Sequence, residues 1–391
     1  MHAQEAISLL IFALGAFAIP LFSGRIGVPA AVGELLFGVL VGPHLLGWIE
    51  PNAFTSFLAE FGFAFLMFLA GLELDFSRIE RQGVGGLLAG LVVVVGMSAL
   101  SLGVTLALGL PLFLFVAFSA LSLGVLMVTL NEAGLTRSRA GQTMIFVGSI
   151  GEFVTIVLLT GFGMYYEFGL GWQLGAQMLK LGLIFVAAYV ALVVLRTIIW
   201  WWPERFVRLV AAHDPSEIGV RAGMAMMLVF VALATLMGVE SILGSFVAGT
   251  LFAFVFREKR VLEAKMASIG FGFFVPIFFI WVGSEFDLSA VLHRSVLPLL
   301  GTFLVVSLVC KLLPSLGLMT RGLSWREAVG AGLLFGAPLT LLVVIARIGI
   351  DVHVIDEATA GALVLLAIVT GVAFPWLFRM LLGCRQQASA S

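Results

Sequence analysis

Glu152 is the only acidic or basic residue between Arg139 and Glu167, in a stretch that is otherwise apolar or small. On a helix it would lie about 20 Å from Arg139 and about 22 Å from Glu167, near the middle of a membrane-spanning segment. An acid at that depth costs at least about 2.5 kcal/mol, and such residues usually mark ion or proton pathways. Glu152 is therefore a candidate site for a proton or a monovalent cation in competition. The alternative is a glutamate that a neighbouring helix satisfies.

Lys311 is the second charged residue inside an apolar segment, about 15 Å before Arg321 on a helix. Its four-carbon side chain is too short to reach the membrane surface from there. Lys311 is the natural electrostatic partner of Glu152, or a proton carrier in its own right. The alternative is a purely structural ion pair.

Neutral oxygens accompany Glu152. Ser149 and Thr155 stand three residues before and after it, on the same helical face. Hydroxyl oxygens of this kind can complete the ligand shell of a hard cation. Ser122 and Thr340, on two other segments, are further candidate ligands.

Two apolar segments, 112–131 and 326–348, contain small or helix-breaking residues at mid-span. These residues are Ser119, Ser122 and Gly124 in the first segment, and Gly336 and Pro338 in the second. Proline removes a helical hydrogen bond. The backbone groups that such breaks free are tolerated at that depth only inside protein or beside a polar cavity.

Other titratable residues are weaker candidates. Glu34 lies early in a broken apolar segment and could take a direct ion role. Glu73 and Asp75 are expected to be solvated at the end of a segment. The remaining group belongs to a loop that either senses pH or is simply exposed; its members are His213, Asp214 and Glu217.

The composition requires a membrane to surround these residues. The chain is 61% hydrophobic and 11% charged, with a mean hydropathy of +1.17, whereas soluble domains are about a quarter charged. The apolar runs are about 20 residues long, which predicts an all-α polytopic protein. Thirteen segments are expected, at 6–22, 29–44, 56–74, 84–108, 112–131, 143–166, 173–202, 217–238, 241–256, 267–284, 290–316, 326–348 and 358–382. Segments 29–44 and 241–256 are expected to be short or kinked.

The distribution of Lys and Arg predicts the orientation. Basic residues concentrate in the loops after odd-numbered segments, and such an excess marks the cytoplasmic side. The N-terminus is thus predicted outside the cell membrane and the C-terminus in the cytoplasm. The first apolar run lacks a basic leader and a cleavage pattern, so it is expected to be a retained helix.

The two broken segments are seven apart, so they cross the membrane in opposite directions. This pattern is typical of inverted repeats, and matching breaks point to a transport site. We predict a first repeat at 1–166, a linker helix and loop at 167–216, a second repeat at 217–384 and a short tail at 385–391.

The chain also resembles the Kef-type members of the second monovalent cation:proton antiporter family over nearly its whole length. The resemblance rests on five strings, "VGELLFGVLVGPHLLG", "FGFAFLMFLAGLELDF", "LNEAGL", "ILGSFVAGTLFA" and "FGFFVPIFFIWVGSEFDL". It implies a sodium/proton-antiporter-like dimer with a dimerisation panel and a mobile core that contains two crossed, unwound helices. It places the family's binding acid at Glu152 and its core lysine at Lys311.

The resemblance further places the family's crossing-helix residues at Ser119, Ser122 and Gly124, and at Gly336, Pro338 and Thr340. The chain departs from the family where Gly151 replaces the usual acid or amide before the binding acid. The nucleotide-binding domain that many Kef proteins carry after the membrane region is expected to be absent.

These observations predict an antiporter that exchanges protons for Na⁺ or K⁺ by alternating access, with a homodimer as its assembly. Two alternatives remain: a sodium-coupled organic-anion transporter of similar fold, and a non-transporting membrane sensor or subunit. No catalytic triad, cofactor motif or nucleic-acid-binding surface is apparent, so no enzyme is expected. Cys310 and Cys384 have neither disulfide nor metal-site spacing.

Overall fold

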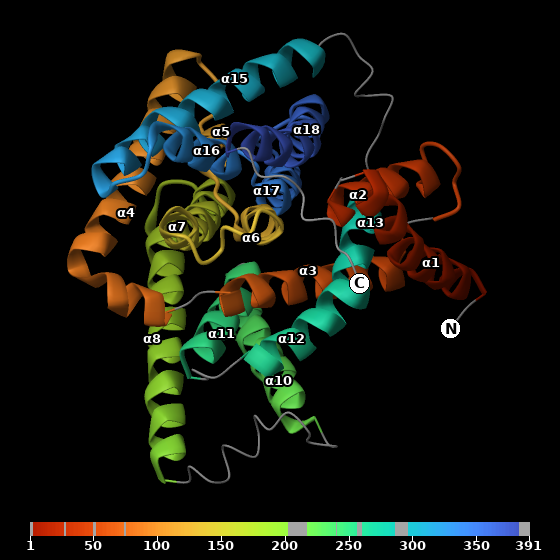
Figure 1. Ribbon diagram of the computed structural model, residues 1–391. Helices are drawn as coiled ribbons and strands as arrows, with labels where there is room; N and C mark the ends of the chain where they lie inside the picture. Colours follow the sequence, from red (N-terminus) through yellow and green to blue (C-terminus); the bar gives the residue numbers. More distant parts are fainter. Residues whose placement is uncertain are drawn as a thin grey trace. The chain divides into compact units, whose positions relative to one another are not determined.

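The computed structural model describes residues 3–26, 29–49, 52–73, 76–201, 217–239, 241–255, 260–285 and 296–382, and helices joined by short turns and loops make up these ranges (Figure 1). The first helices are α1 (Ala3–Ile26), α2 (Ala30–Val41), α3 (Ala53–Glu73), α4 (Phe76–Ala107), α5 (Leu114–Ser119), α6 (Leu123–Glu132), α7 (Arg139–Phe168) and α8 (Trp172–Trp201). They are followed by α10 (Ile218–Leu236), α11 (Ser241–Val255), α12 (Arg260–Ile269), η1 (Gly270–Phe274), α13 (Val275–Glu285), α15 (Val296–Ser315), η2 (Leu316–Arg321), α16 (Trp325–Phe335), α17 (Leu339–Asp351) and α18 (Glu357–Leu382).

The number of membrane segments agrees approximately with the thirteen predicted. Within the described residues, eleven helical stretches are long and apolar enough to cross a membrane. Two further apolar helices, α2 and α11, are shorter, and they are the two segments that the sequence analysis expected to be short. The protein is therefore a multi-pass, all-helical membrane protein.

The chain forms two compact units, and each is composed of distant parts of the sequence. Unit 1 comprises 1–25, 33–77 and 167–285, which hold α1–α3, α8 and α10–α13. Unit 2 comprises 26–32, 78–166 and 286–391, which hold most of α4–α7 and α15–α18. These units cut across the repeats expected from the sequence, because compactness and internal repetition are different properties. The inverted repeat stays a prediction.

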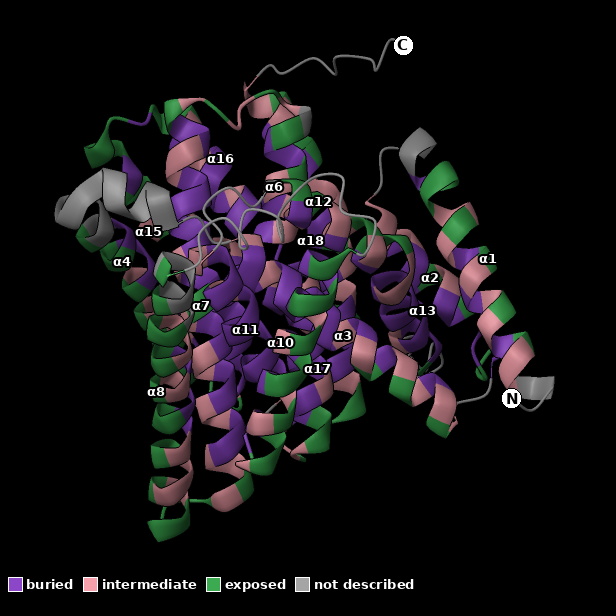
Figure 2. Cartoon of the chain, turned by 90° about the horizontal axis from the view of Figure 1, so that it is seen from below, coloured by how far each residue is buried: buried purple, intermediate pink, exposed green. Residues whose placement is uncertain are grey.

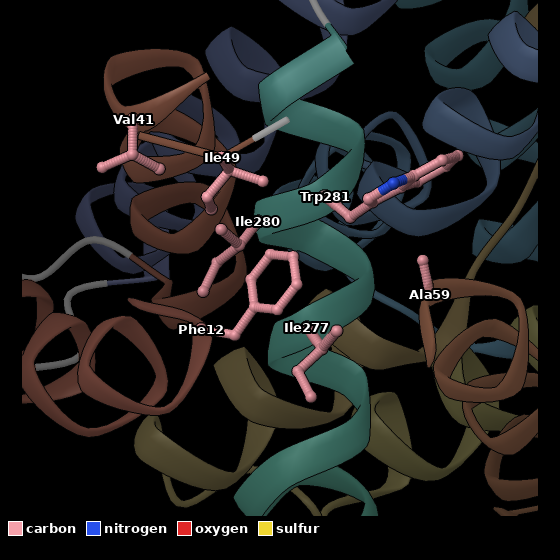
Figure 3. Packing of buried hydrophobic residues seen from close by; sticks show 7 residues of the cluster. All are labelled: Phe12, Val41, Ile49, Ala59, Ile277, Ile280 and Trp281. Atoms are coloured by element: carbon pink, nitrogen blue, oxygen red, sulfur yellow. The ribbon is translucent and has the colours of Figure 1, made fainter. Parts of the chain in front are cut away.

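Unit 1 is built on close helix crossings at glycines. A side chain at Gly71 of α3 would overlap the carbonyl oxygen of Phe246 in α11, and one at Gly38 of α2 would overlap that of Ile280 in α13. Glycine lets helix backbones approach closely where no water drives apolar association. Around α13, Ile277 and Ile280 lie beside Phe12 of α1 (Figure 3). The helices of unit 1 are thus held together by close backbone contacts at glycines and by packing of apolar side chains.

A π-helical turn interrupts the helix between α12 and α13. It spans Gly270–Phe274, and the amide of Val275 donates to the carbonyl of Gly270. Pro276 follows at once and has no amide hydrogen to donate, so the regular bonding pattern cannot continue there. This helical stretch begins at Arg260, earlier than the predicted segment 267–284. The prediction started late because the first residues of α12 include charged ones, which a search for apolar runs leaves out.

Unit 2 holds the most enclosed helices. In the most apolar part of each span, 89% of the residues are buried in Trp325–Asp351 (α16–α17) but only 17% in Trp172–Val194 (α8). Figure 2 shows the exposed and half-buried surface along α8. Within unit 2, α5 packs against α15 and α17, and α6 packs against α16 and α18. The two interrupted pairs, α5–α6 and α16–α17, therefore lie inside this unit.

Candidate ion-binding site

The first break separates α5 from α6. Ala120 has φ −55° and ψ 133°, and Ser122 has φ −135° and ψ 141°. These are extended conformations, so helical hydrogen bonding stops after Ser119 and resumes at Leu123. Gly124 lies one residue inside α6, beyond the unwound segment, and Ser119 is the last residue of α5. The small residues of this stretch predict such an interruption.

The second break separates α16 from α17. Helix α16 starts at a capping box between Ser324 and Glu327, and ends at Phe335. Gly336, Ala337 and Pro338 then connect it to α17, which begins at Leu339. A Cβ atom at Gly336 would lie 2.8 Å from the ring of Phe374, so a larger residue does not fit there without movement.

Hydroxyl groups from the two breaks contact each other, and the one from the first break also contacts Glu152. Ser122 Oγ lies 3.0 Å from Thr340 Oγ1 and donates to Glu152 Oε1 at 3.4 Å. Glu152 is only 2% exposed. The three oxygens come from three helices: Ser122 precedes α6, Thr340 is in the first turn of α17, and Glu152 is in α7.

The electrostatics at this point favour a negative charge. Ser122 and Thr340 stand at the N-terminal ends of α6 and α17, where backbone amides and the helix dipole carry partial positive charge. A carboxylate is stabilised there, although it is buried. When a small cation is present, the same carboxylate and two hydroxyls offer it oxygen ligands.

Lys311 lies on the other side of the first break. Its ammonium group is fully buried and donates to the carbonyl oxygen of Ala120 at 2.6 Å. Ala120 directly follows α5, where the helix dipole places partial negative charge. Among the residues that the structure describes, this ammonium forms no ion pair with Glu152. The prediction that Lys311 is the charge partner of Glu152 stays a prediction.

The other neutral oxygens of α7 are differently placed. Ser149 Oγ donates to Ile145 O at 2.8 Å, within its own helix. Thr155 Oγ1 donates to Gly151 O at 2.7 Å and accepts from the Leu121 amide at 3.1 Å. Ser149 is therefore directed along α7, whereas Thr155 contacts the break.

Gly151 has a steric explanation. A Cβ atom at this position would lie 2.8 Å from Leu121 Cδ1 and 3.0 Å from Leu121 Cβ. The side chain of Leu121 thus occupies the space beside Glu152 that an acid or amide at position 151 would need. A side chain at position 151 would therefore require Leu121 to move.

Weaker candidates lie elsewhere. Glu34 is buried in α2 and Glu73 ends α3, both in unit 1. Glu217 forms an ion pair of 2.7 Å with Lys265. The remaining three, Asp75, His213 and Asp214, are outside the described residues.

Sequence reasoning did not identify the backbone groups of the break. The carbonyl of Ala120 and the amide of Leu121 take part in the hydrogen bonding, and neither is visible in the residue type. The only available signal was the position of both residues between Ser119 and Ser122, in the stretch expected to unwind.

Comparison with known families identifies the architecture. The model of a family described as "Sodium/hydrogen exchanger, transmembrane" matches residues 9–382. This chain belongs to that family. The prediction of a cation:proton antiporter family is confirmed, while the narrower Kef-type assignment stays a prediction.

Curated relatives carry consistent names. The putative Na⁺/H⁺ antiporter YjbQ of Bacillus subtilis is 30% identical over 97% of this chain and 64% of its own length. The Na⁺/H⁺-K⁺ antiporter GerN of Bacillus cereus is 26% identical, with 94% of this chain and 93% of GerN covered. The K⁺/H⁺ antiporter 1 of Saccharomyces cerevisiae is 24% identical over 94% of this chain and 46% of its own length. This chain thus spans less than two thirds of YjbQ and about half of the yeast protein.

The fold matches a solved antiporter structure. The sodium proton antiporter MjNhaP1 of Methanocaldococcus jannaschii superposes with a TM-score of 0.63 at 15% identity, covering 95% of this chain and 96% of MjNhaP1. The predicted sodium/proton-antiporter-like fold is confirmed.

Proposed function

We propose that this chain is a secondary antiporter that exchanges protons for Na⁺ or K⁺ by alternating access. The observation that carries the proposal is the buried Glu152 carboxylate beside the hydroxyls of Ser122 and Thr340, between the N-terminal ends of two half-helices. The names of the relatives, which are Na⁺/H⁺, Na⁺/H⁺-K⁺ and K⁺/H⁺ antiporters, support it.

The proposed mechanism uses competition at one carboxylate. Deprotonated Glu152 binds the cation together with the oxygens of Ser122 and Thr340, and Ser149 is a further candidate ligand. When a proton arrives, it neutralises the carboxylate and the cation leaves. Because one group cannot hold both, loading on one side of the membrane requires release of the other species. In this mechanism, Lys311 keeps its hydrogen bond to the Ala120 carbonyl while the cation and the proton exchange.

The finer features of the proposal follow from the sequence. We assign the chain to the Kef-type branch, in the cell membrane with the N-terminus outside and the C-terminus in the cytoplasm, as a homodimer. A sodium-coupled carrier of organic anions is less favoured. Such a carrier would need a positively charged group to bind its substrate, but the buried ammonium of Lys311 donates to the carbonyl of Ala120.

A proteoliposome experiment tests this function. Vesicles that are acidic inside and contain a pH dye receive Na⁺ or K⁺ outside, with wild type, Glu152→Gln and Glu167→Gln compared. Glu167 is a matched control because it is exposed at the end of the same helix, α7. We expect cation-dependent alkalinisation with wild type and Glu167→Gln, and none with Glu152→Gln.

The responsive cation would identify the substrate. Silence of inserted, folded wild type with both cations would contradict the antiporter proposal. Full exchange by Glu152→Gln would contradict the role of this carboxylate.

A further inference from the structure

Three consecutive residues of the first break are each tied to a different partner. The Ala120 carbonyl accepts from Lys311 of α15. The Leu121 amide donates to Thr155 of α7. The Ser122 hydroxyl contacts Thr340 of α17 and Glu152 of α7. Thr155, the side chain in the second of these bonds, has no part in the binding step proposed above.

The geometry of Thr155 fixes the direction of its hydroxyl group. Its hydrogen is donated to the carbonyl of Gly151 at 2.7 Å, so the oxygen must present a lone pair to the Leu121 amide. Thr155 and Leu121 are each only 1% exposed. Water therefore does not reach this amide, and a buried amide without an acceptor is strongly unfavourable.

We propose that Thr155 is a positioning residue for ion binding: its hydroxyl holds the Leu121 amide and thereby sets the positions of both neighbours in the break. The carbonyl of Ala120 lies one residue before this anchor, and the hydroxyl of Ser122 lies one residue after it. This inference rests on the proposed antiport, and it assigns to Thr155 a role that differs from the ligand role expected from its spacing.

The consequence for binding follows from the short connection. Binding groups must be held within about 0.5 Å of their productive geometry. Without the acceptor, the Leu121 amide has to turn towards another partner, and this moves Ser122 away from Glu152 and Thr340. The carboxylate itself remains, so the cation still binds, but with lower affinity.

Thr160 provides a matched control. It lies on the same helix, is 2% exposed, and donates to Ile156 O at 2.9 Å in the same way that Thr155 donates to Gly151. This hydrogen bond stays within α7, whereas Thr155 also contacts the first break. Substitution of either threonine by valine removes the same hydroxyl from the same kind of site.

The experiment compares wild type, Thr155→Val, Thr155→Ser and Thr160→Val in two measurements. In the proteoliposome assay, we expect Thr155→Val to raise the KM for the cation about tenfold with a smaller change in maximal rate. Thr155→Ser and Thr160→Val should stay within about threefold of the wild-type KM. Equal KM values for Thr155→Val and Thr160→Val would overturn the proposal.

The second measurement is hydrogen exchange by mass spectrometry of the peptide that contains Leu121, on protein in nanodiscs without any gradient. Thr155→Val should speed exchange in this peptide about fivefold or more, and Thr160→Val should not. This arm does not depend on transport. If wild type proved inactive, the proposed antiport would fail while this result would still decide whether Thr155 anchors the break.

Discussion

The two broken helices of unit 2 satisfy their backbones in different ways. In the first break, the amide of Leu121 is supplied with an acceptor by Thr155, a residue of another helix. In the second break, Pro338 has no amide hydrogen, so no acceptor is needed at that position. The amides of Gly336 and Ala337 bond back to carbonyls of α16, to Gly332 at 3.0 Å and Leu334 at 3.2 Å.

This difference shows which break is coupled to its surroundings. At a proline there is no amide hydrogen that a neighbouring helix would have to satisfy. A break that relies on borrowed partners moves only if those partners move with it. The first break is bonded to α7, which carries Glu152, and to α15, which carries Lys311. We therefore expect substitutions around the first break to change ion binding, and those at residues 336–338 of the second break to change stability first.

Lys311→Met should have the largest effect. It removes the donor to the Ala120 carbonyl and a buried charge while an unbranched apolar side chain fills the space. A hydrogen bond from a charged group is worth about 1.5–3 kcal/mol, so we expect exchange to fall about 100-fold. Removal of the buried charge offsets part of the cost of leaving the Ala120 carbonyl without its donor, so the unfolding temperature should change by less than about 4 °C.

Ser307→Ala is the matched control for this prediction, because Ser307 lies one turn before Lys311 on α15 and is also buried. Its exchange should stay near that of wild type. Wild-type exchange by Lys311→Met would contradict the coupling of the first break to α15.

Leu121→Pro should make the first break resemble the second, in which a proline replaces a residue whose amide would need an acceptor. The conformation of Ala120, φ −55° and ψ 133°, is one that a residue before proline adopts readily. With no amide at position 121, the acceptor on Thr155 is no longer needed. We expect Leu121→Pro to bring the KM of Thr155→Val back to within about threefold of wild type, less any loss from the packing of Leu121 against Gly151.

Leu123→Pro in the same background is the control. Leu123 is the first residue of α6, a position that tolerates proline, but its substitution leaves the Leu121 amide in place. Rescue by this variant, or the same high KM after Leu121→Pro, would show that the amide is not what Thr155 serves.

Gly336→Ala and Gly124→Ala should give the smallest effects and opposite signs. A Cβ atom at Gly336 would meet the Phe374 ring at 2.8 Å, whereas at Gly124 nothing lies within 4 Å. We expect Gly336→Ala to lower the free energy of unfolding by about 1–3 kcal/mol. Gly124→Ala, inside α6, should leave it unchanged or raise it by up to about 1 kcal/mol. Thermal unfolding in detergent measures both, and a similar loss for both variants would contradict this account.

Much of the fold follows from the sequence, because a membrane imposes simple rules on the chain. The long apolar runs predicted the helices, and the short runs 29–44 and 241–256 correspond to α2 and α11. The residue types at 119–124 and 336–338 pointed to the two interruptions, because proline and small residues weaken helical bonding locally. Residue type alone is not decisive, since Pro20, Pro314 and Pro375 lie inside continuous helices.

The hydrogen bonding of the site could not be predicted in the same way. Spacing along α7 grouped Thr155 with Ser149, but one hydroxyl contacts the break and the other its own helix. Charge alone suggested that Lys311 pairs with Glu152, but backbone carbonyls at a helix end also attract an ammonium group. Such partial charges have no residue letter, so only the folded backbone locates them.

The most direct test of the central claim is calorimetric titration of Na⁺ and of K⁺ into purified protein, in two buffers with different ionisation enthalpies. The difference between buffers gives the number of protons released per bound cation. Competition at one carboxylate predicts that up to one proton is released per bound cation. This number should fall as pH rises, because Glu152 is then already deprotonated. The Glu152→Gln variant should bind no cation. Cation binding without proton release across the pH range, or unchanged binding to Glu152→Gln, would contradict the claim that cation and proton share this carboxylate.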